Sequence, residues 1–314
     1  MTSLRALGGS DLSVFPLSLG GNVFGWTADQ DQSFAVLDAY TSGGGNFIDT
    51  ADAYSQWAPG NSGGESETII GKWLAARGNR ADVVVATKVG AHLQHKGLAA
   101  NTIKTAAEES LRRLGTDYID LYYTHYDDPT VPVEEIITAL DQLVQDGKVR
   151  AIAASNITPE RLQESLDFSD REGLAKYVAL QPHYNLVSRD TYEGALQETA
   201  SRAGLAAVPY YSLASGFLTG KYRPGQTVDS RRAEGAGKHL ETERGRKVLG
   251  ALDRIAQERG AEIATVALAW LAARPTVAAP IASARTVEQL PALLAVADLE
   301  LTDAEVSELT AASA

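Results

Sequence analysis

The chain has 314 residues and a formal net charge of −12, with 44% hydrophobic and 22% charged residues. This composition is typical of a folded protein with a large core and excludes a disordered chain, and the acidic balance disfavours nucleic acid and anionic membranes as partners. Because the sequence contains no cysteine, disulfides, thiolate catalysis and cysteine-ligated metals are excluded.

The sequence shows no sign of export, of a membrane span or of an internal division. No stretch approaches the ~18 consecutive apolar residues that cross a bilayer, and residues 1–15 lack the charged-then-apolar order of a secretion signal. We therefore expect a cytoplasmic protein. No linker or shift in composition divides the chain, so we expect residues 1–314 to form a single domain.

Short apolar segments that alternate with helical patterns predict the strands. Residues 4–7 and 12–15 flank Gly8, Gly9 and Ser10, which predicts a β-hairpin at the bottom of a barrel. Further strands are expected to begin near Pro16, Asn46, Asp82, Tyr118, Val149, Tyr177, Gly204 and Thr276. Most of the intervals match the βα unit of about 30 residues. The pattern predicts an α/β protein with a closed (β/α)8 (TIM) barrel and a short N-terminal hairpin.

Three helices are well marked between these strands. Residues 133–144 carry apolar side chains at helical spacing, a second helix follows Asn101 and stops at Gly115, and a third covers residues 262–274. The last interval between strands is long because residues 211–240, rich in glycine, lysine and arginine, resemble an inserted loop.

Four polar side chains follow the ends of three successive apolar strands. Asp49 and Tyr54 come after the second barrel strand, Lys88 lies at the end of the third and His125 follows the fourth. In a parallel barrel such positions meet on the C-terminal face, where active sites lie. Each residue alone is more often a surface, capping or packing residue, but four complementary groups together favour catalysis.

These four groups suit the reduction of a carbonyl. A phenol with a pKa of about 10 stays protonated at neutral pH and can donate a proton. A neighbouring ammonium stabilises the phenolate and brings its pKa toward the operating pH, while a carboxylate keeps that ammonium charged. A histidine adds a hydrogen bond to the reacting oxygen. Since no side chain supplies hydride, a cofactor is required.

The chain resembles the aldo-keto reductase superfamily over residues 12–294. The motifs that carry the resemblance are FIDTADAY at 47–54, ATK at 86–88, SLRRLGTDYIDL at 110–121 and TH at 124–125. The resemblance implies a catalytic tetrad of Asp49, Tyr54, Lys88 and His125. It also implies that Tyr54 is the general acid in reduction and the general base in oxidation.

The sequence lacks a Rossmann fingerprint, so a nicotinamide cofactor would have to bind at the barrel face. Barrels bind phosphate through the loops after strands seven and eight. Residues 210–221 offer glycines, hydroxyls and Lys221. Ser283 and Arg285 precede a helix expected from about Thr286, whose N-terminus would favour phosphate. This arrangement favours NADPH over NADH.

The resemblance extends the predicted cofactor site. It implies that Tyr210 stacks on the nicotinamide ring and that Ser155, Asn156 and Gln181 bind the carboxamide. The expected cofactor-binding residues are Gly20, Gly21, Asn22, Asp49, Ser155, Asn156, Gln181, Tyr210, Tyr211, Ser212, Leu213, Ser215, Gly216, Leu218, Lys221, Ile281, Ser283, Arg285 and Gln289. Many relatives carry a Glu-Asn pair where this chain has residues 291–293, Pro-Ala-Leu, so the adenine contacts differ from that pattern.

Aromatic residues near the strand ends indicate the substrate side. Trp26, Trp57 and Tyr126 would line a pocket for planar or moderately apolar carbonyls, although packing on the barrel rim is the alternative for each. The glycine-rich residues 55–64 predict a flexible loop that closes over substrate. His92 and His95 lack a third ligand, so we expect them to be solvated and expect no metal.

The leading hypothesis is an NADPH-dependent reductase of small-molecule aldehydes or ketones, with sugars among the candidate substrates. The main alternative is an NADP(H)-binding regulatory protein, because some members of the superfamily serve as potassium-channel β subunits. An aldolase that uses Lys88 as a Schiff base is disfavoured, because Asp49 would keep the lysine charged. The oligomeric state, the direction of reaction and the physiological substrate are left open by the sequence.

Overall fold

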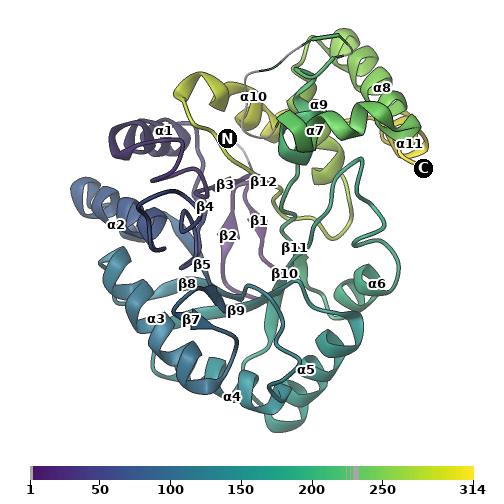
Figure 1. The fold of residues 1–314 in the computed structure, drawn as a ribbon. Coiled ribbons are helices and arrows are strands. Elements are labelled where there is room, and N and C mark those ends of the chain that lie inside the picture. The colour runs from purple at the N-terminus through teal and green to yellow at the C-terminus, as the bar shows by residue number, and fades with distance from the viewer. Residues whose placement is uncertain (1–2, 224, 227, 229–232) are drawn as a thin grey trace.

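The computed structural model describes residues 3–223, 225–226, 228 and 233–314. Within these residues, eight parallel strands curl into a barrel, and helices surround them (Figure 1). In order around the sheet, the strands are β11 (Ala206–Ala207), β10 (Tyr177–Gln181), β9 (Val149–Ser155), β8 (Ile119–Thr124), β5 (Val84–Val89), β4 (Phe47–Asp49), β3 (Ser18–Gly20) and β12 (Ile281–Ala282).

Backbone hydrogen bonds close the barrel between its two outermost strands. The Ala207 N–H donates to Thr276 O at 2.7 Å, the Ala278 N–H donates to Ala207 O at 2.9 Å and the Ile281 N–H donates to Pro209 O at 2.8 Å. The sheet therefore has no free edge there. The predicted (β/α)8 barrel is confirmed.

Helices cover the outside of the barrel, as Figure 1 shows. The α-helices are α1 (Gln30–Ser42), α2 (Glu65–Arg77), α3 (Ala100–Leu114), α4 (Val133–Gln145), α5 (Pro159–Glu172), α6 (Ala195–Arg202), α7 (Ala233–Glu241), α8 (Glu243–Arg259), α9 (Ile263–Ala272), α10 (Leu290–Leu294) and α11 (Asp303–Ala312). Short 3-10 helices are η1 (Arg80–Asp82), η2 (Ala214–Thr219), η3 (Val287–Gln289) and η4 (Ala295–Ala297). No helix in the described ranges is both long and apolar enough to cross a membrane.

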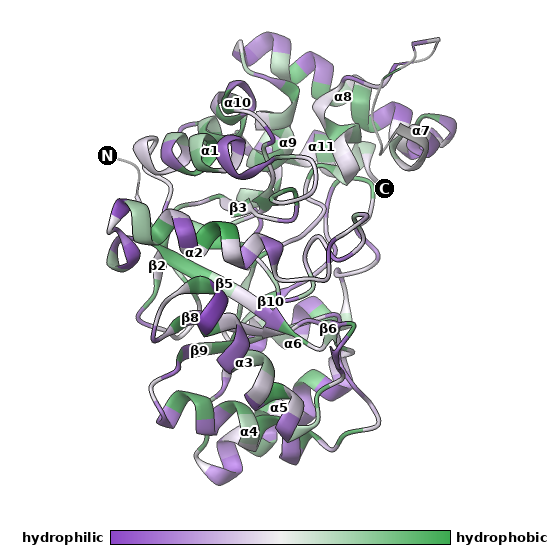
Figure 2. Cartoon of the chain, turned by 60° about the vertical axis from the view of Figure 1, so that its left-hand side comes forward, coloured by the Kyte–Doolittle hydropathy of each residue, from purple (hydrophilic) through white to green (hydrophobic). Residues whose placement is uncertain are grey.

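The core has two layers because side chains alternate along each strand. Ala86 and Tyr123 belong to a buried cluster inside the barrel, whereas Val85 and Tyr122 belong to a larger cluster between the strands and the helices. In Figure 2, β5 changes from green to purple toward its C-terminal end, where Lys88 lies. The apolar parts of the strands thus build the core, and their polar ends are left for the site.

The predicted N-terminal hairpin is present as β1 (Arg5–Ala6) and β2 (Ser13–Val14), which pair antiparallel. Leu7, Leu12 and Val14 are buried in the inner cluster, so the hairpin closes the end of the barrel opposite the site. Gly8 turns the chain with φ +57°, and a Cβ there would lie 2.0 Å from Val178 O. Only glycine fits this close approach.

Two predictions about the elements need correction. Asn101 does not precede its helix but lies inside α3, which starts at Ala100 because the carboxylate of Glu135 in α4 accepts the Ala100 N–H at 2.9 Å. Residues 211–240 are not simply a loop, because η2 and most of α7 fall within them; residues 224, 227 and 229–232 of that stretch lie outside the described residues.

Candidate active site

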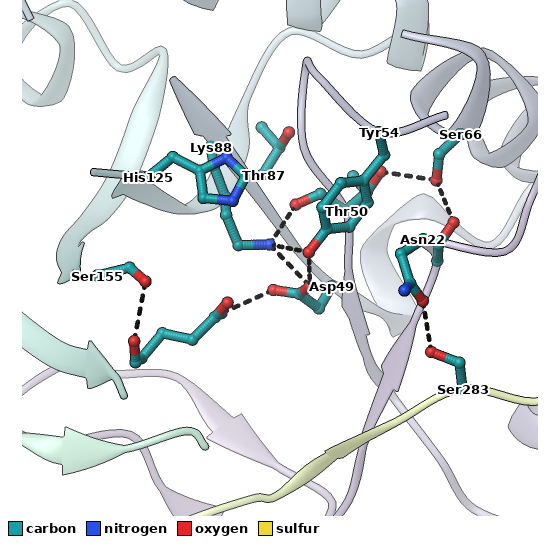
Figure 3. Close-up of polar contacts among 12 residues, drawn as sticks. Asn22, Asp49, Thr50, Tyr54, Ser66, Thr87, Lys88, His125, Ser155 and Ser283 are labelled. Carbon is teal, nitrogen blue, oxygen red and sulfur yellow. Dashed lines mark hydrogen bonds and ion pairs between the residues drawn. The ribbon is translucent and has the colours of Figure 1, made fainter. Parts of the chain in front are cut away.

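The structure brings together the four predicted catalytic residues at the C-terminal ends of three adjacent strands (Figure 3). Asp49 is the last residue of β4, Lys88 lies near the end of β5, and His125 directly follows β8. Tyr54 comes from the loop after β4 and points back toward the same place. This convergence follows from the parallel order of β4, β5 and β8.

Lys88 lies at the centre of the hydrogen bonds among these residues. Its ammonium donates to Asp49 Oδ2 at 2.7 Å, to the Tyr54 hydroxyl oxygen at 2.8 Å and to Thr50 O at 2.7 Å. The Tyr54 hydroxyl donates in turn to Asp49 Oδ2 at 3.0 Å. The Lys88 side chain is 0% exposed, so these contacts satisfy all three of its N–H donors away from water.

Burial determines the protonation of Tyr54 and Lys88. Burial, and then the negative charge of Asp49, raise the pKa of Tyr54 well above its ordinary value, so the hydroxyl is a proton donor at neutral pH. Burial also lowers the pKa of Lys88, against the opposing effect of Asp49. Our expectation that Lys88 brings the pKa of Tyr54 down is therefore wrong for this arrangement, because burial and Asp49 outweigh it.

His125 is neutral and packs against two tyrosine rings. Burial, and then the charge of Lys88, lower the pKa of His125 well below its ordinary value. Its ring stacks on Tyr126 with centroids 5.0 Å apart and meets Tyr54 edge-on at 6.0 Å. Its buried Nδ1 has no hydrogen-bond partner among the described residues. A neutral imidazole beside the phenol can donate one hydrogen bond to a reacting carbonyl oxygen.

A cavity of about 800 Å³ opens beside these residues, and most of the predicted site lines it. Asp49, Tyr54 and His125 face the cavity, while Lys88 lies behind them. The predicted cofactor residues that line it are Gly20, Asn22, Asp49, Ser155, Asn156, Gln181, Tyr210, Tyr211, Ser212, Leu213, Ser215, Gly216, Lys221, Ile281, Ser283, Arg285 and Gln289. A site of this size is large enough for a cofactor together with a small substrate.

Two predicted cofactor residues do not line the cavity. Gly21 lies beneath it, where its N–H donates to Asp49 O at 2.7 Å and a Cβ would come within 2.8 Å of Ser66 Oγ. Leu218 points from η2 into the hydrophobic core and is 0% exposed. Neither residue lines the cavity, and their contact with a cofactor stays a prediction.

Three polar residues connect the cavity wall to the tetrad. The amide of Gln181 donates to Asp49 Oδ1 at 2.8 Å, and the Ser155 hydroxyl donates to Gln181 O at 2.8 Å. Asn156 has φ +48°, donates to His125 O at 2.8 Å and accepts the Tyr210 hydroxyl at 2.8 Å. A strained backbone at a site residue persists only where its surroundings hold it.

The wall of the cavity also carries cationic and hydroxyl groups. Lys221, Ser283 and Arg285 line it, and the Ser283 hydroxyl donates to Asn22 Oδ1 at 2.6 Å. A Cβ on Gly20 would lie 2.5 Å from Ser283 Oγ, so only glycine keeps this approach open. These groups fit the phosphates of a dinucleotide.

A helical segment begins directly after Thr286, as predicted, but its elements are short. Thr286 precedes the three-residue η3, and the following α10 has five residues. The side chain of Gln289 turns back and accepts the Arg285 N–H at 2.8 Å, which occupies one amide of this turn. The contribution of this helix start to phosphate binding stays a prediction, and the side chains of Ser283 and Arg285 support it.

The loop after β11 has an unusual backbone. Tyr211, Ala214 and Ser215 have φ values of +54°, +47° and +57°, and Gly216 has +96°. Positive φ is uncommon outside glycine, and such strain clusters at ligand-binding segments. Tyr211, Ser215 and Gly216 line the cavity, so the loop lies where the sequence predicts a binding segment.

The predicted substrate residues form an aromatic mouth. Trp26, Trp57 and Tyr126 all line the cavity, and Trp57 and Tyr126 are 48% and 55% exposed. The rings of Trp26 and Trp57 meet at right angles with centroids 5.6 Å apart. Trp57 also contacts Tyr54 edge-on at 6.1 Å, so the aromatic mouth reaches the proton donor.

The glycine-rich loop after Tyr54 is tied to the segment that follows β3. The Ser55 hydroxyl donates to Phe24 O at 2.7 Å, and the Asn61 amide donates to Gly25 O at 2.9 Å. These bonds hold the base of residues 55–64, and closure of the loop over substrate stays a prediction.

His92 is buried and His95 is partly buried, contrary to the expectation that both are solvated. They sit on β6 (Ala91–His92) and β7 (His95–Lys96), which form a hairpin beside the site. Their rings stack 5.5 Å apart, His92 is 4% exposed, and His95 Nε2 lies 2.9 Å from Glu109 Oε2. Tertiary packing accounts for both residues.

Several lining residues were not predicted. They are Val23, Thr27, Ala53, Gln56, Ala91, Thr219, Glu262, Ala264, Ala282, Ala292 and Leu293. Most are small or apolar and carry no chemical signal in the sequence. Gln56 is an exception: it bonds to both Ala91 and Leu93 of the hairpin, at 3.2 Å each, and thereby fixes the rim of the cavity.

Comparison with known proteins agrees with this geometry. The profile of the Aldo/keto reductase family matches residues 16–314. An aryl-alcohol dehydrogenase [NADP(+)] of Phanerodontia chrysosporium is 32% identical over 96% of this chain and 83% of its own length. The uncharacterized oxidoreductase YrpG of Bacillus subtilis is 36% identical over 90% of this chain and 87% of its own.

A further relative is named as a channel subunit and not as an oxidoreductase. A probable voltage-gated potassium channel subunit beta of Oryza sativa is 35% identical over 91% of this chain and 88% of its own length. The family therefore includes proteins with both kinds of name, and the matches cover 83% to 88% of these three relatives. By profile, by relatives and by its barrel, this chain belongs to the aldo/keto reductase family.

Proposed function

We propose that this protein reduces aldehyde or ketone carbonyls to alcohols with NADPH, with Tyr54 as the general acid. The observation that carries the proposal is the position of the Tyr54 hydroxyl, which lines the cavity and lies 2.8 Å from Lys88 Nζ and 3.0 Å from Asp49 Oδ2. An acid held in this way at the wall of a cavity fits proton transfer to a bound oxygen.

Each of the four residues has its own role in the proposed reaction. Tyr54 transfers its proton to the carbonyl oxygen, and the Lys88 ammonium stabilises the phenolate that results. Asp49 holds Lys88 in place at 2.7 Å. Neutral His125 orients the carbonyl oxygen through one hydrogen bond. When bound, NADPH supplies the hydride that no side chain can provide.

The residues present fit a phosphorylated dinucleotide. Lys221 and Arg285 supply positive charge, and Ser212, Ser215 and Ser283 supply hydroxyls along the same cavity. Arg285 and Ser283 support binding of a 2′-phosphate and hence NADPH over NADH. The name of the Phanerodontia relative, which specifies NADP(+), points the same way.

The aromatic mouth supports a small-molecule carbonyl substrate with a planar or apolar part. Trp26, Trp57 and Tyr126 provide ring surface beside Tyr54. The net charge of −12 supports the inference that neither nucleic acid nor an anionic membrane is a partner. A cytoplasmic location, a single domain and the absence of a bound metal remain inferences from the sequence.

The second candidate is an NADP(H)-binding regulatory protein with little turnover. The name of the rice relative, a channel subunit, favours it, and the same cavity would serve to bind the cofactor. Buried Tyr54 and Lys88 do not distinguish the two roles, because a binding protein can keep the same residues. Only turnover separates them.

One experiment tests both candidates. The purified protein is titrated with NADPH and with NADH while tryptophan fluorescence is followed, and an aromatic aldehyde is then added while nicotinamide absorbance is followed. Turnover by the wild type that Tyr54→Phe abolishes supports the reductase. Tight NADPH binding without turnover across a wide carbonyl panel supports the regulatory role, and no binding of either nucleotide refutes both.

A further inference from the structure

A second group of buried charges lies on the outer side of β5, behind the site. Asp52 and Glu67 are 1% and 0% exposed, and we call them the outer carboxyl pair. Arg113 of α3 reaches them from the helix layer. These residues take no part in the proposed chemistry, yet burying carboxyl groups is unfavourable unless they are paired or neutral. Their presence therefore requires an explanation.

Glu67 holds β5 from outside. Its Oε1 accepts the Thr87 hydroxyl at 2.5 Å, and its Oε2 accepts Arg113 Nε at 2.6 Å. Thr87 precedes Lys88, and since side chains alternate along a strand, the two point to opposite faces of β5. Asp49 thus holds Lys88 from inside the barrel, while Glu67 holds its neighbour from outside.

Asp52 is buried without a cation of its own. Neither of its carboxyl oxygens has a hydrogen-bond partner among the described residues, while its N–H donates to Lys88 O at 3.3 Å. Burial, and then the negative charge of Glu67, raise the pKa of Asp52 well above its ordinary value. Although Arg113 and Lys88 act in the opposite direction, burial without a hydrogen-bond partner for either oxygen favours the protonated form of Asp52.

The charges balance only if Asp52 is protonated. Two carboxylates, Asp49 and Glu67, face two cations, Lys88 and Arg113, and each ion pair is direct. A charged Asp52 would leave one uncompensated negative charge in the interior.

The other titratable groups around the pair do not change this balance. Burial lowers the pKa of His92 of β6, which is therefore neutral at pH 7, and burial raises the pKa of Tyr122 of β8 well above its ordinary value. Glu109 approaches Arg113 at 3.5 Å from the solvent side and is only partly buried. Within this cluster, the outer carboxyl pair is therefore the place where the loss of one negative charge can be offset by the release of a proton.

We propose that Glu67 is a positioning residue for Lys88, acting through Thr87, and that Asp52 is a reserve carboxylic acid that ionises when the charge of Glu67 is lost. The inference rests on the function proposed for Lys88 and Tyr54. Loss of Glu67 would leave Arg113 without its direct buried carboxylate partner, with only the 3.5 Å contact to the partly exposed Glu109. Ionisation of Asp52 would restore the balance near Lys88.

A distinct pattern among variants follows. Asp52→Asn removes a neutral group and leaves the charges unchanged, while in Glu67→Gln the reserve Asp52 takes over the negative charge. Only the double variant removes both buried carboxyl groups near Arg113, and the positive field of Arg113 then disfavours the ammonium of Lys88 and favours the phenolate of Tyr54. Both effects make activity fall at a lower pH on the basic side of the pH profile than in the wild type. The two substitutions are therefore expected to be non-additive.

Infrared spectroscopy tests the protonated Asp52 directly. At pH 7 the difference spectrum of wild type minus Asp52→Asn should contain the carbonyl band of a protonated carboxylic acid. The corresponding band should be missing from Glu67→Gln, in which Asp52 has ionised. A difference spectrum without the band, or a band that persists in Glu67→Gln, would overturn the proposal. This measurement needs no turnover.

Two titrations test the positioning role. The basic limb of the pH profile of kcat/KM should move to lower pH by about one unit in the double variant, and by much less in either single variant. The NMR titration of the Lys88 Cε signal should move in the same direction, which is readable even if the protein turns over no substrate. Equal shifts in Glu67→Gln and in the double variant would contradict the reserve role of Asp52.

Matched controls separate charge from structure. Glu109→Gln removes a carboxylate that also contacts Arg113 but not Thr87, and it should leave the Lys88 titration unchanged. Thr87→Val removes the hydroxyl that Glu67 accepts, whereas Thr87→Ser keeps it. We expect Thr87→Val to lower kcat with little change in KM and Thr87→Ser to restore it. If Thr87→Val and Thr87→Ser behave identically, Glu67 does not act on Lys88 through Thr87, and this result holds even if Glu67→Gln fails to fold.

Discussion

The hydroxyl oxygen of Tyr54 accepts a hydrogen bond from Lys88 Nζ at 2.8 Å inside a site that hides the ammonium from water. Because a charge acts more strongly in such surroundings than in water, Lys88 can stabilise a phenolate as it forms. Before proton transfer, however, burial keeps the pKa of Tyr54 high. At neutral pH, Tyr54 therefore keeps its proton, and Lys88 favours release of that proton only when an acceptor is bound.

Tyr54→Phe should lower the rate of carbonyl reduction by about 10²- to 10⁴-fold, the usual contribution of a general acid. The ring stays in place and the hydroxyl alone is lost, so NADPH affinity measured by fluorescence should change little. Tyr126→Phe is the matched control, because Tyr126 also lines the cavity but lies outside the Lys88 contacts. Equal loss of activity in both variants would remove Tyr54 from its proposed role.

Arg285→Ala should weaken NADPH binding about tenfold or more, which corresponds to one charge-assisted hydrogen bond. NADH binding should change much less, because NADH has no 2′-phosphate. Isothermal titration with both nucleotides measures the difference. Arg274→Ala is the control and should leave both affinities unchanged, because Arg274 contacts Trp270 and does not line the cavity. A similar loss for both nucleotides after Arg285→Ala would show that Arg285 does not read the 2′-phosphate.

The sequence predicted the barrel and the tetrad because both depend on local patterns. Apolar strands at regular intervals specify the βα units, and the parallel order then brings Asp49, Lys88 and His125 to one face without further information. The position of Tyr54 followed from its short distance along the chain from Asp49. These features need only the periodicity of the sequence and one rule of topology.

What the sequence could not predict depends on contacts between distant segments. Asn101 looks like a helix cap, but Glu135 from the next helix satisfies the start of α3 instead. His92 reads as a polar loop residue, yet packing buries it. Leu218 lies within a binding motif but points into the core. In each case tertiary packing overrode a local signal that was sound by itself.

Gly8→Ala should destabilise the barrel without altering the site. A Cβ would lie 2.0 Å from Val178 O, and the backbone has φ +57°, so we expect a loss of about 1–3 kcal/mol from backbone strain, with more if the hairpin shifts. Gly9→Ala is a close control, since a Cβ at Gly9 meets nothing within 4 Å. Urea denaturation should separate the two variants, and equal midpoints would show that the hairpin tolerates a side chain at Gly8.

Glu305 in α11 should make stability depend on pH. The bidentate hydrogen bonds from Arg259, both at 2.6 Å, and then the Thr302 N–H lower the pKa of Glu305 from 4.5 to about 2. Because the folded value lies below the unfolded one, the contribution is complete above pH 4.5 and is lost as the pH falls toward 2. Solvent screening limits it to about 1 kcal/mol or less.

Glu305→Gln should therefore lower the melting temperature at pH 7, and the difference from wild type should shrink steadily as the pH is lowered through 4.5 toward 2. Glu300→Gln removes the same charge from the exposed segment before α11 and should show a much smaller difference at pH 7. High salt should reduce the effect of Glu305→Gln, since exposed pairs are screened. A difference between wild type and Glu305→Gln that stays constant down to pH 2 would assign the stabilisation to the capping geometry of Thr302 and not to the charge of Glu305.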